Sequence, residues 1–320
     1  MQNQKPWKSY QAQLNILKAR GLKVGDEAKA LHYLERIGYY RLSGYWYPFR
    51  ENDPVQARQK TNQFKADSYF EDAVKLYVFD KRLRLLALDA LERIELALRV
   101  DVSHLLGKTD VCGHENPNLF HGGFSKHVDK KSRMTAHQQW LKSFDRKVSR
   151  ARKEPFIEHY QKKYKGQLPI WVACEVWDFG GLSHLFAGLK LSDQQMIADK
   201  YGVLAKNSTD PRHTPLMQWI RSLNFIRNVS AHHSRLWNIS MMEMSAPIPL
   251  DYWQDINSER CFFYFCVMQQ MLKTICPNST WGKRVLSLIK EMPIPRNSSV
   301  SWQGMGILKP NDLEKWDLWQ

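Results

Sequence analysis

The chain of 320 residues has few cysteines and lacks a long apolar run, and each shortage excludes a class of protein. The cysteines are odd in number and form no Cys-x-x-Cys pair. They are Cys112, Cys174, Cys261, Cys266 and Cys276. A disulfide framework is therefore not expected, and a reducing cytoplasm fits best. The most apolar stretch, residues 261–268, is far shorter than the roughly 20 residues of a membrane span. Residues 1–7 lack the apolar core of a signal peptide.

Acidic residues are also in deficit. The 47 lysines and arginines outnumber the 32 aspartates and glutamates, which gives a formal net charge of +15 and a pI near 9.5. Such an excess predicts an anionic partner, with nucleic acid first and a membrane surface second; a charge that only aids solubility is the simpler alternative. No glycine-rich phosphate loop, nucleophile elbow or pair of metal-binding carboxylates is present.

Apolar residues recur at helical spacing along the whole chain, and no series of strands is recognisable. The longest predicted helix runs from about Ser68 to Leu106 and contains no glycine or proline before Gly107. Residues 51–63, which are polar and carry Pro54, are predicted as a loop. The class is therefore all-α.

Capping residues mark several predicted helix starts: Ser9, Asp26, and Thr214 before Pro215. Gly180 and Gly181 are expected to break the apolar segment 169–177, with Ser183 capping the helix that follows.

Three segments are expected along the chain. Residues 1–64 form an N-terminal helical and aromatic segment that packs on the core. Residues 65–290 form the main helical domain, whose last helices are predicted at 258–275 and 281–290. Residues 291–320 form an irregular C-terminal tail.

The segment 224–238, NFIRNVSAHHSRLWN, carries the residues best suited to chemistry. Metal-free RNA cleavage needs a base for the ribose 2′-OH, an acid for the leaving 5′-oxygen, and a cation for the charge that builds on the phosphate. The histidine pKa lies near neutrality, so His232 suits the proton transfers. The planar guanidinium of Arg227 suits the phosphate. The alternative is that both are satisfied polar groups that join one helix to the next.

The spacing of Arg227 and His232 limits how they can cooperate. Five residues correspond to roughly 500° around a straight helix, so the two side chains do not share a face. Both reach one phosphate only if the helix starts or bends between them, or if a second copy contributes. Asn228 and Ser230 would be caps for such a start.

The string 226–238, IRNVSAHHSRLWN, resembles the Abi (abortive infection) proteins of the D/F type within the HEPN superfamily, whose signature is an arginine followed after four to six residues by a histidine. Further blocks with this resemblance are KPW at 5–7, RIGYYRLSGY at 36–45 and LERIE at 91–95. The resemblance spans most of the chain.

This resemblance implies a HEPN-type helical bundle with additional N- and C-terminal helices, which commonly forms a homodimer. It also implies a metal-independent endoribonuclease that acts as a growth-arresting toxin in antiviral defence, needs no cofactor and leaves a 2′,3′-cyclic phosphate. Arg227 would stabilise the scissile phosphate, His232 would act as general acid or base, and Asn228 would orient the motif. His233 also fits the proton-transfer role. Since each chain has one motif, a composite site would need two chains.

Supporting residues are expected on the long helix. Glu92 or Glu95 would orient Arg227 through an ion pair, although both also fit an ordinary ladder of charges along a helix.

Two basic segments are candidates for RNA contact. Arg41 and Arg50 lie in the aromatic run 36–50, which either stacks bases or belongs to the core. A second run, between 146 and 153, offers a basic footprint or a solvated helix face. Its candidate residues are Arg146, Lys147, Arg150 and Arg152.

Two alternative functions remain open on the sequence. The first is a non-catalytic RNA-binding module, held in complex with a structured small RNA. The second is a protein–protein interaction domain that uses the apolar helix at 262–268. Cys112, His114, His121 and His127 lie in one segment and suggest zinc, but their spacing matches no standard set, and no metal site is predicted.

Overall fold

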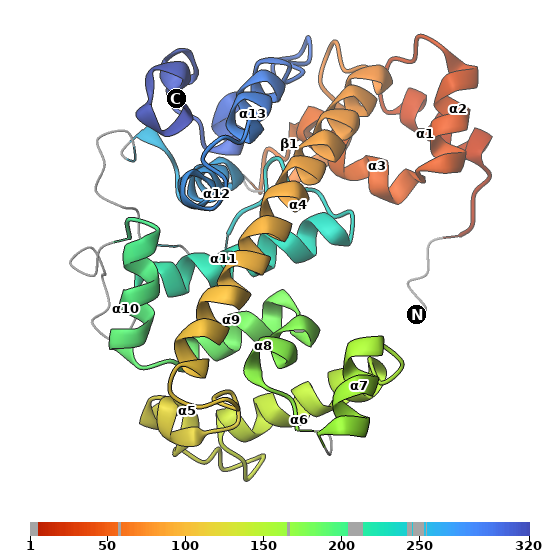
Figure 1. Cartoon of the computed structure of the whole chain (residues 1–320). Helices are drawn as coiled ribbons and strands as arrows, with labels where there is room; N and C mark the ends of the chain where they lie inside the picture. The colour runs from red at the N-terminus through yellow and green to blue at the C-terminus, as the bar shows by residue number, and fades with distance from the viewer. Residues whose placement is uncertain are drawn as a thin grey trace.

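The computed structural model describes residues 6–56, 59–164, 167–203, 214–241, 245, 253 and 255–320. One long helix, α4 (Phe70–Gly107), runs diagonally through the molecule, and the other helices pack around it (Figure 1). The chain is mostly helical, which confirms the all-α class.

The helices fall into groups along α4. Before it come α1 (Tyr10–Ala19), α2 (Glu27–Arg36) and α3 (Tyr39–Trp46). Around its C-terminal half lie α5 (Gly122–Ser125), α6 (Ala136–Arg150), α7 (Pro155–Lys163), α8 (Ile170–Ala173), α9 (Phe179–Gly188) and α10 (Leu191–Lys200). The remainder are α11 (Pro215–Ala231), α12 (Cys261–Ile275) and α13 (Trp281–Lys290).

Helix α4 forms as the sequence predicts, without a break. Most of its apolar residues form a buried stripe along its length, from Phe70 through Ile94 to Leu106, and it contacts α3, α9, α11, α12 and α13. The apolar stretch 261–268 forms most of α12, and every residue of it is buried within the chain. The idea that this stretch is an exposed partner-binding face is therefore wrong.

The predicted N-caps of α1, α2 and α11 are confirmed. Ser9 accepts a hydrogen bond from the amide of Ala12, and Asp26 from that of Lys29. Thr214 accepts one from Met217 at the start of α11. Residues 51–63 are not only a loop, however, because β1 (Arg50–Asn52) pairs antiparallel with β2 (Lys60–Phe64). Phe64, the last residue of β2, is buried in the core, while Asn62 and Gln63 before it are exposed.

The predicted start of α9 is wrong. The helix begins at Phe179, so Gly180 and Gly181 lie in its first turn and Ser183 is buried inside it. The cap is Asp178, whose Oδ1 accepts a hydrogen bond from the Gly181 amide at 2.7 Å.

The segment after α13 contains only short 3₁₀ turns, η6 (Trp302–Met305), η7 (Pro310–Lys315) and η8 (Asp317–Trp319). Trp319 stacks on Phe262 of α12 with ring centroids 6.0 Å apart. Gln269 of α12 also donates a hydrogen bond to the carbonyl of Leu318. This segment therefore helps to bury α12. None of the described helices combines the length and apolarity needed to cross a membrane.

Candidate functional site

Helix α11 ends inside the predicted motif. Arg227 lies in its last turns, Ala231 is its last residue, and His232 follows as the C-cap. The Ser234 amide donates to the Val229 carbonyl and the His233 amide to the Ser230 carbonyl. These two bonds form a Schellman motif, which satisfies carbonyls that a helix end leaves free.

His233 occupies the left-handed position of this motif, with φ of 58°. Glycine usually takes that position, and a residue with a Cβ there costs of the order of 1 kcal/mol. The sequence thus places a strained histidine directly after the predicted proton-transfer residue. Both His232 and His233 are exposed.

The expectation that Asn228 or Ser230 caps a helix start is wrong, since both lie within α11. Asn228 instead accepts a hydrogen bond from Nη1 of Arg227 through its Oδ1 at 3.3 Å. The helix continues without interruption from Arg227 to Ala231. Arg227 and His232 therefore point about 140° apart around the axis.

The segment after the motif is held by buried groups of α4. The carboxylate of Asp80 accepts hydrogen bonds from the amides of Leu236 and Trp237, and it pairs with the Arg84 guanidinium. The hydroxyl of Tyr45 donates to the same carboxylate at 2.7 Å. Burial and the charge of Asp80 raise the pKa of Tyr45, so this hydroxyl stays protonated. The i,i+4 spacing of Asp80 and Arg84 is the only sequence signal for this buried ion pair, and the many other charges of the helix obscure it.

Helix α3 holds the same segment from the other side. Arg41 donates to the carbonyl of His233, and Arg235 donates to the carbonyl of Gly44. The block 36–45 and the motif, which share the family resemblance, are therefore in direct contact. Arg41, a candidate for RNA contact, lies beside the motif and anchors its backbone.

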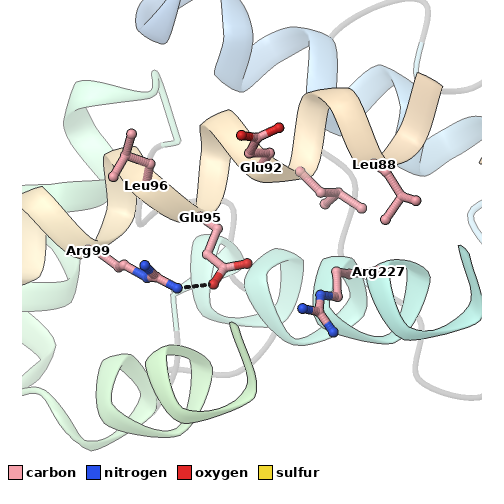
Figure 2. Close-up of a pocket in the computed structure, with 7 residues that line it drawn as sticks. Leu88, Glu92, Glu95, Leu96, Arg99 and Arg227 are labelled. Atoms are coloured by element: carbon pink, nitrogen blue, oxygen red, sulfur yellow. Dashed lines mark hydrogen bonds and ion pairs between the residues drawn. The ribbon is translucent and has the colours of Figure 1, made fainter. Parts of the chain in front are cut away.

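Arg227 lines an open groove of about 460 Å³ between α4 and α11 (Figure 2). Both predicted supporting residues, Glu92 and Glu95, line it too. The expected ion pair with Arg227 is not formed by the described side chains, because Glu95 pairs with Arg99. Arg99 also donates to the carbonyl of Trp177, which fixes that pair in place.

Asp178 was missed by the sequence analysis, which placed a helix break after it. Its carboxylate pairs with the Lys147 amine at 2.7 Å. Burial raises the pKa of Asp178, but the hydrogen bonds from Lys147 and the Gly181 amide and the charge of Arg227 outweigh it and hold that pKa below its usual value. A Cβ at position 181 would lie 2.9 Å from the Lys147 amine, so glycine there leaves room for the ion pair.

The other RNA-contact candidates are dispersed. Lys147 pairs with Asp178, the carboxylate whose pKa the charge of Arg227 also lowers. Arg146, Arg150 and Arg152 are exposed at the end of α6 and beyond it. Arg50 lies at the hairpin, with its guanidinium 5.8 Å from the centroid of the Phe64 ring. The aromatic run itself is divided between two environments. Its buried members are Leu42, Tyr45, Trp46 and Phe49, and its exposed ones are Tyr40 and Tyr47.

Two of the four residues considered for zinc have other polar contacts. The Cys112 thiol donates to the carbonyl of Leu168, and His121 caps α5. His114 is buried, and both of its ring nitrogens lack a hydrogen-bond partner. Across the described ranges, no three His, Cys, Asp or Glu side chains are arranged to hold a metal ion.

The protein is an all-α bundle that carries an Arg–His motif at the end of a helix. The Abi-like protein family matches residues 32–238, and the chain belongs to this family. The match includes α4, α11 and the anchored segment up to Asn238. Membership points to abortive infection, a form of antiviral defence against phages. No match was found among curated proteins or among solved structures.

Proposed function

We propose that this protein is a metal-independent endoribonuclease that cuts RNA as a growth-arresting toxin in abortive infection. One observation carries the proposal: Arg227 lines an open groove, and the exposed His232 directly follows the same helix. The buried carboxylate of Asp80 anchors the segment that leaves this helix. In this proposal the RNA phosphate binds at Arg227, and His232 transfers a proton to or from the reacting oxygens.

The functional site is a composite of two copies in this proposal. Arg227 and His232 diverge around an unbroken helix, so the two side chains on one phosphate come from different protomers. The exposed apolar side chains of α4 beside the groove, Leu85, Leu96 and Val100, support this arrangement. Leu96 lines the groove together with Arg227, so a second copy packed there would enclose both motifs.

The chemistry divides between the protomers as follows. A histidine of one copy takes the proton of the ribose 2′-OH, and the oxygen attacks the adjacent phosphorus. The 5′-oxygen leaves with a proton from the second histidine, which gives a 2′,3′-cyclic phosphate and a 5′-hydroxyl. The arginines stabilise the charge on the phosphate oxygens, where removing one such group typically costs about 10²- to 10³-fold in rate.

The test is cleavage of labelled total RNA by purified protein in EDTA. Wild type should cut, while Arg227→Ala and His232→Ala should lose about 100-fold or more. Arg221→Ala removes an exposed arginine from the same helix and is the matched control. His233→Gly keeps the left-handed turn and separates the two histidines: loss of cleavage in this variant alone would assign proton transfer to His233.

The second candidate is a non-catalytic RNA-binding module that holds a structured small RNA. The net charge of +15 favours it as much as it favours the nuclease. RNA bound by every variant, with no cleavage by wild type alone or with lysate of phage-infected cells, would select the binding module.

A further inference from the structure

A second groove, of about 580 Å³, lies between residues 6–8, α1 and the start of α3. Its volume falls within the roughly 300 to 1,000 Å³ typical of ligand sites. Its aromatic walls are Trp7, Tyr10, Tyr39 and Tyr40. Nothing in the proposed cleavage reaction uses these residues.

The aromatic rings of this groove are unusually open to solvent. Trp7 is 87% exposed and Tyr40 is 92% exposed. Tyr39, in contrast, is fixed: it packs edge-on against buried Trp46 at 5.3 Å and accepts a hydrogen bond from Arg20. The groove thus has one rigid wall and two rings whose faces are free to stack.

Gly38 sets the position of the two tyrosines. It precedes α3 with φ of 91°, a left-handed conformation that favours glycine. This turn brings Tyr39 and Tyr40, in the first turn of α3, back against the start of α1. The backbone turn at Gly38 therefore fixes where the aromatic wall of the groove lies.

The positive charge of the groove indicates which kind of ligand it binds. Among the described residues that line it, two are cations, Lys8 and Arg20, and none is a carboxylate. The first 25 residues of the chain contain five lysines and arginines and no aspartate or glutamate. An apolar peptide helix would leave these cations without partners. A flat ring attached to a phosphate suits both the aromatic and the basic residues.

The groove also adjoins the proposed cleavage site. Tyr40 directly precedes Arg41, whose guanidinium holds the carbonyl of His233. One turn of α3 therefore presents a ring to the groove and a cation to the motif.

We propose that this groove binds unpaired nucleobases of the RNA, stacked on Trp7 and Tyr40, with Lys8 and Arg20 on the adjoining phosphates. The proposal rests on the proposed function for its ligand, RNA, and adds a preference for single strands. Bases in a duplex already stack on each other and do not offer their faces.

The experiment measures binding in the full chain carrying Arg227→Ala, so that no RNA is cut. Fluorescence anisotropy compares an unstructured 20-nucleotide RNA, the same RNA made abasic, and a blunt-ended duplex of equal length. Trp7→Ala and Tyr40→Ala should each weaken binding of the unstructured RNA about 10-fold, because stacking on one ring contributes on this scale. Neither should change binding of the abasic RNA or the duplex by more than about 2-fold. Trp171→Ala and Tyr164→Ala, which remove exposed rings elsewhere, are the matched controls and should have no effect.

Three outcomes overturn the proposal. Equal affinity of all variants for the unstructured RNA leaves the nuclease intact and removes the groove from RNA binding. An effect that persists on the abasic RNA shows that stacking is not the cause. Absence of RNA binding by any version removes this proposal, and EDTA-resistant cleavage by the chain with Arg227 intact then decides separately whether the proposed function survives.

Discussion

The carboxylate of Asp80 accepts a hydrogen bond of 2.7 Å from the amide of Trp237, 157 residues further along the chain. This bond joins the central helix to the segment that leaves the Arg227–His232 motif. Asp80 is fully buried together with Arg84, so the contact is shielded from water and from salt. The position of the end of α11 is thereby coupled to the core of the molecule.

Asp80→Ala should lower the free energy of unfolding by about 3 to 5 kcal/mol, because it leaves the Arg84 charge and two amides buried without their acceptor. Urea denaturation followed by circular dichroism measures the change. Asp89→Ala removes a carboxylate from the same helix, where Asp89 and its two partners, Arg93 and Arg284, are partly exposed, and should cost less than about 1 kcal/mol. Equal effects of the two variants would show that the buried pair has no special role.

A second prediction concerns His114 and acid stability. Burial lowers the pKa of His114 to about 4, with a smaller effect of His137, so the folded protein holds this ring neutral. The unfolded chain takes up a proton near pH 6.5. Above pH 6.5 this group therefore does not lower the free energy of unfolding. As the pH falls toward 4, protonation of the unfolded chain lowers that free energy, by about 2 kcal/mol between pH 7 and pH 5.

His114→Phe should abolish that part of the pH dependence, because the ring already lies among Trp140, Phe144 and Trp177. Urea denaturation of wild type and variant at pH 5 and pH 7 checks this. His159→Phe, at an exposed site, serves as the control. A variant with the same loss between pH 7 and pH 5 as wild type would assign the acid sensitivity to other groups.

The third prediction addresses the charge beside Arg227. Asp178→Asn keeps an acceptor for the Gly181 amide but removes the anion next to Lys147 and Arg227. Binding of RNA in low salt should tighten, about 2- to 5-fold, and the gain should shrink as salt rises. Anisotropy titrations at several salt concentrations measure it. Weaker binding would mean that Asp178 mainly positions Arg227, so that its charge is needed.

Dimerisation is the fourth prediction. Leu85→Lys and Val100→Lys place charges on the exposed face of α4, where both residues are 56% exposed. Across a twofold interface the lysines would repel, so the dimer should dissociate and cleavage should fall with it, although the Arg227–His232 motif is unchanged. Analytical ultracentrifugation and the EDTA cleavage assay are run on the same samples.

Val111→Lys, at an exposed apolar residue beyond the end of α4, is the control for added charge. A monomer that cuts RNA at the wild-type rate would contradict the composite site.

Much of the fold follows from the sequence because its signals are local. The uninterrupted apolar period of α4 and the caps Ser9, Asp26 and Thr214 each depend on residues within a few positions. The candidate motif residues Arg227 and His232 are proposed from their chemistry together with the family resemblance. The end of α11 was not predicted, because the C′ residue is His233, where glycine is the usual signal.

Long-range partners escaped prediction for a physical reason. Asp80 and Asp178 have the local appearance of a helix charge and a loop residue. Their roles come from Trp237 and Lys147, which only the packed chain brings near. The aromatic run 36–50 likewise has no local feature that separates buried Trp46 from exposed Tyr40.

The most direct test of the central claim is the structure of the RNA ends that the protein produces in EDTA. Attack by the ribose 2′-OH predicts a 2′,3′-cyclic phosphate, or its opened form, and a 5′-hydroxyl, detected by mass spectrometry of a defined oligonucleotide. A single 2′-deoxy substitution at the cut position should abolish cleavage there and leave other positions unchanged. Products with a 5′-phosphate, or cleavage at the 2′-deoxy linkage, would contradict a metal-free Arg227–His232 nuclease.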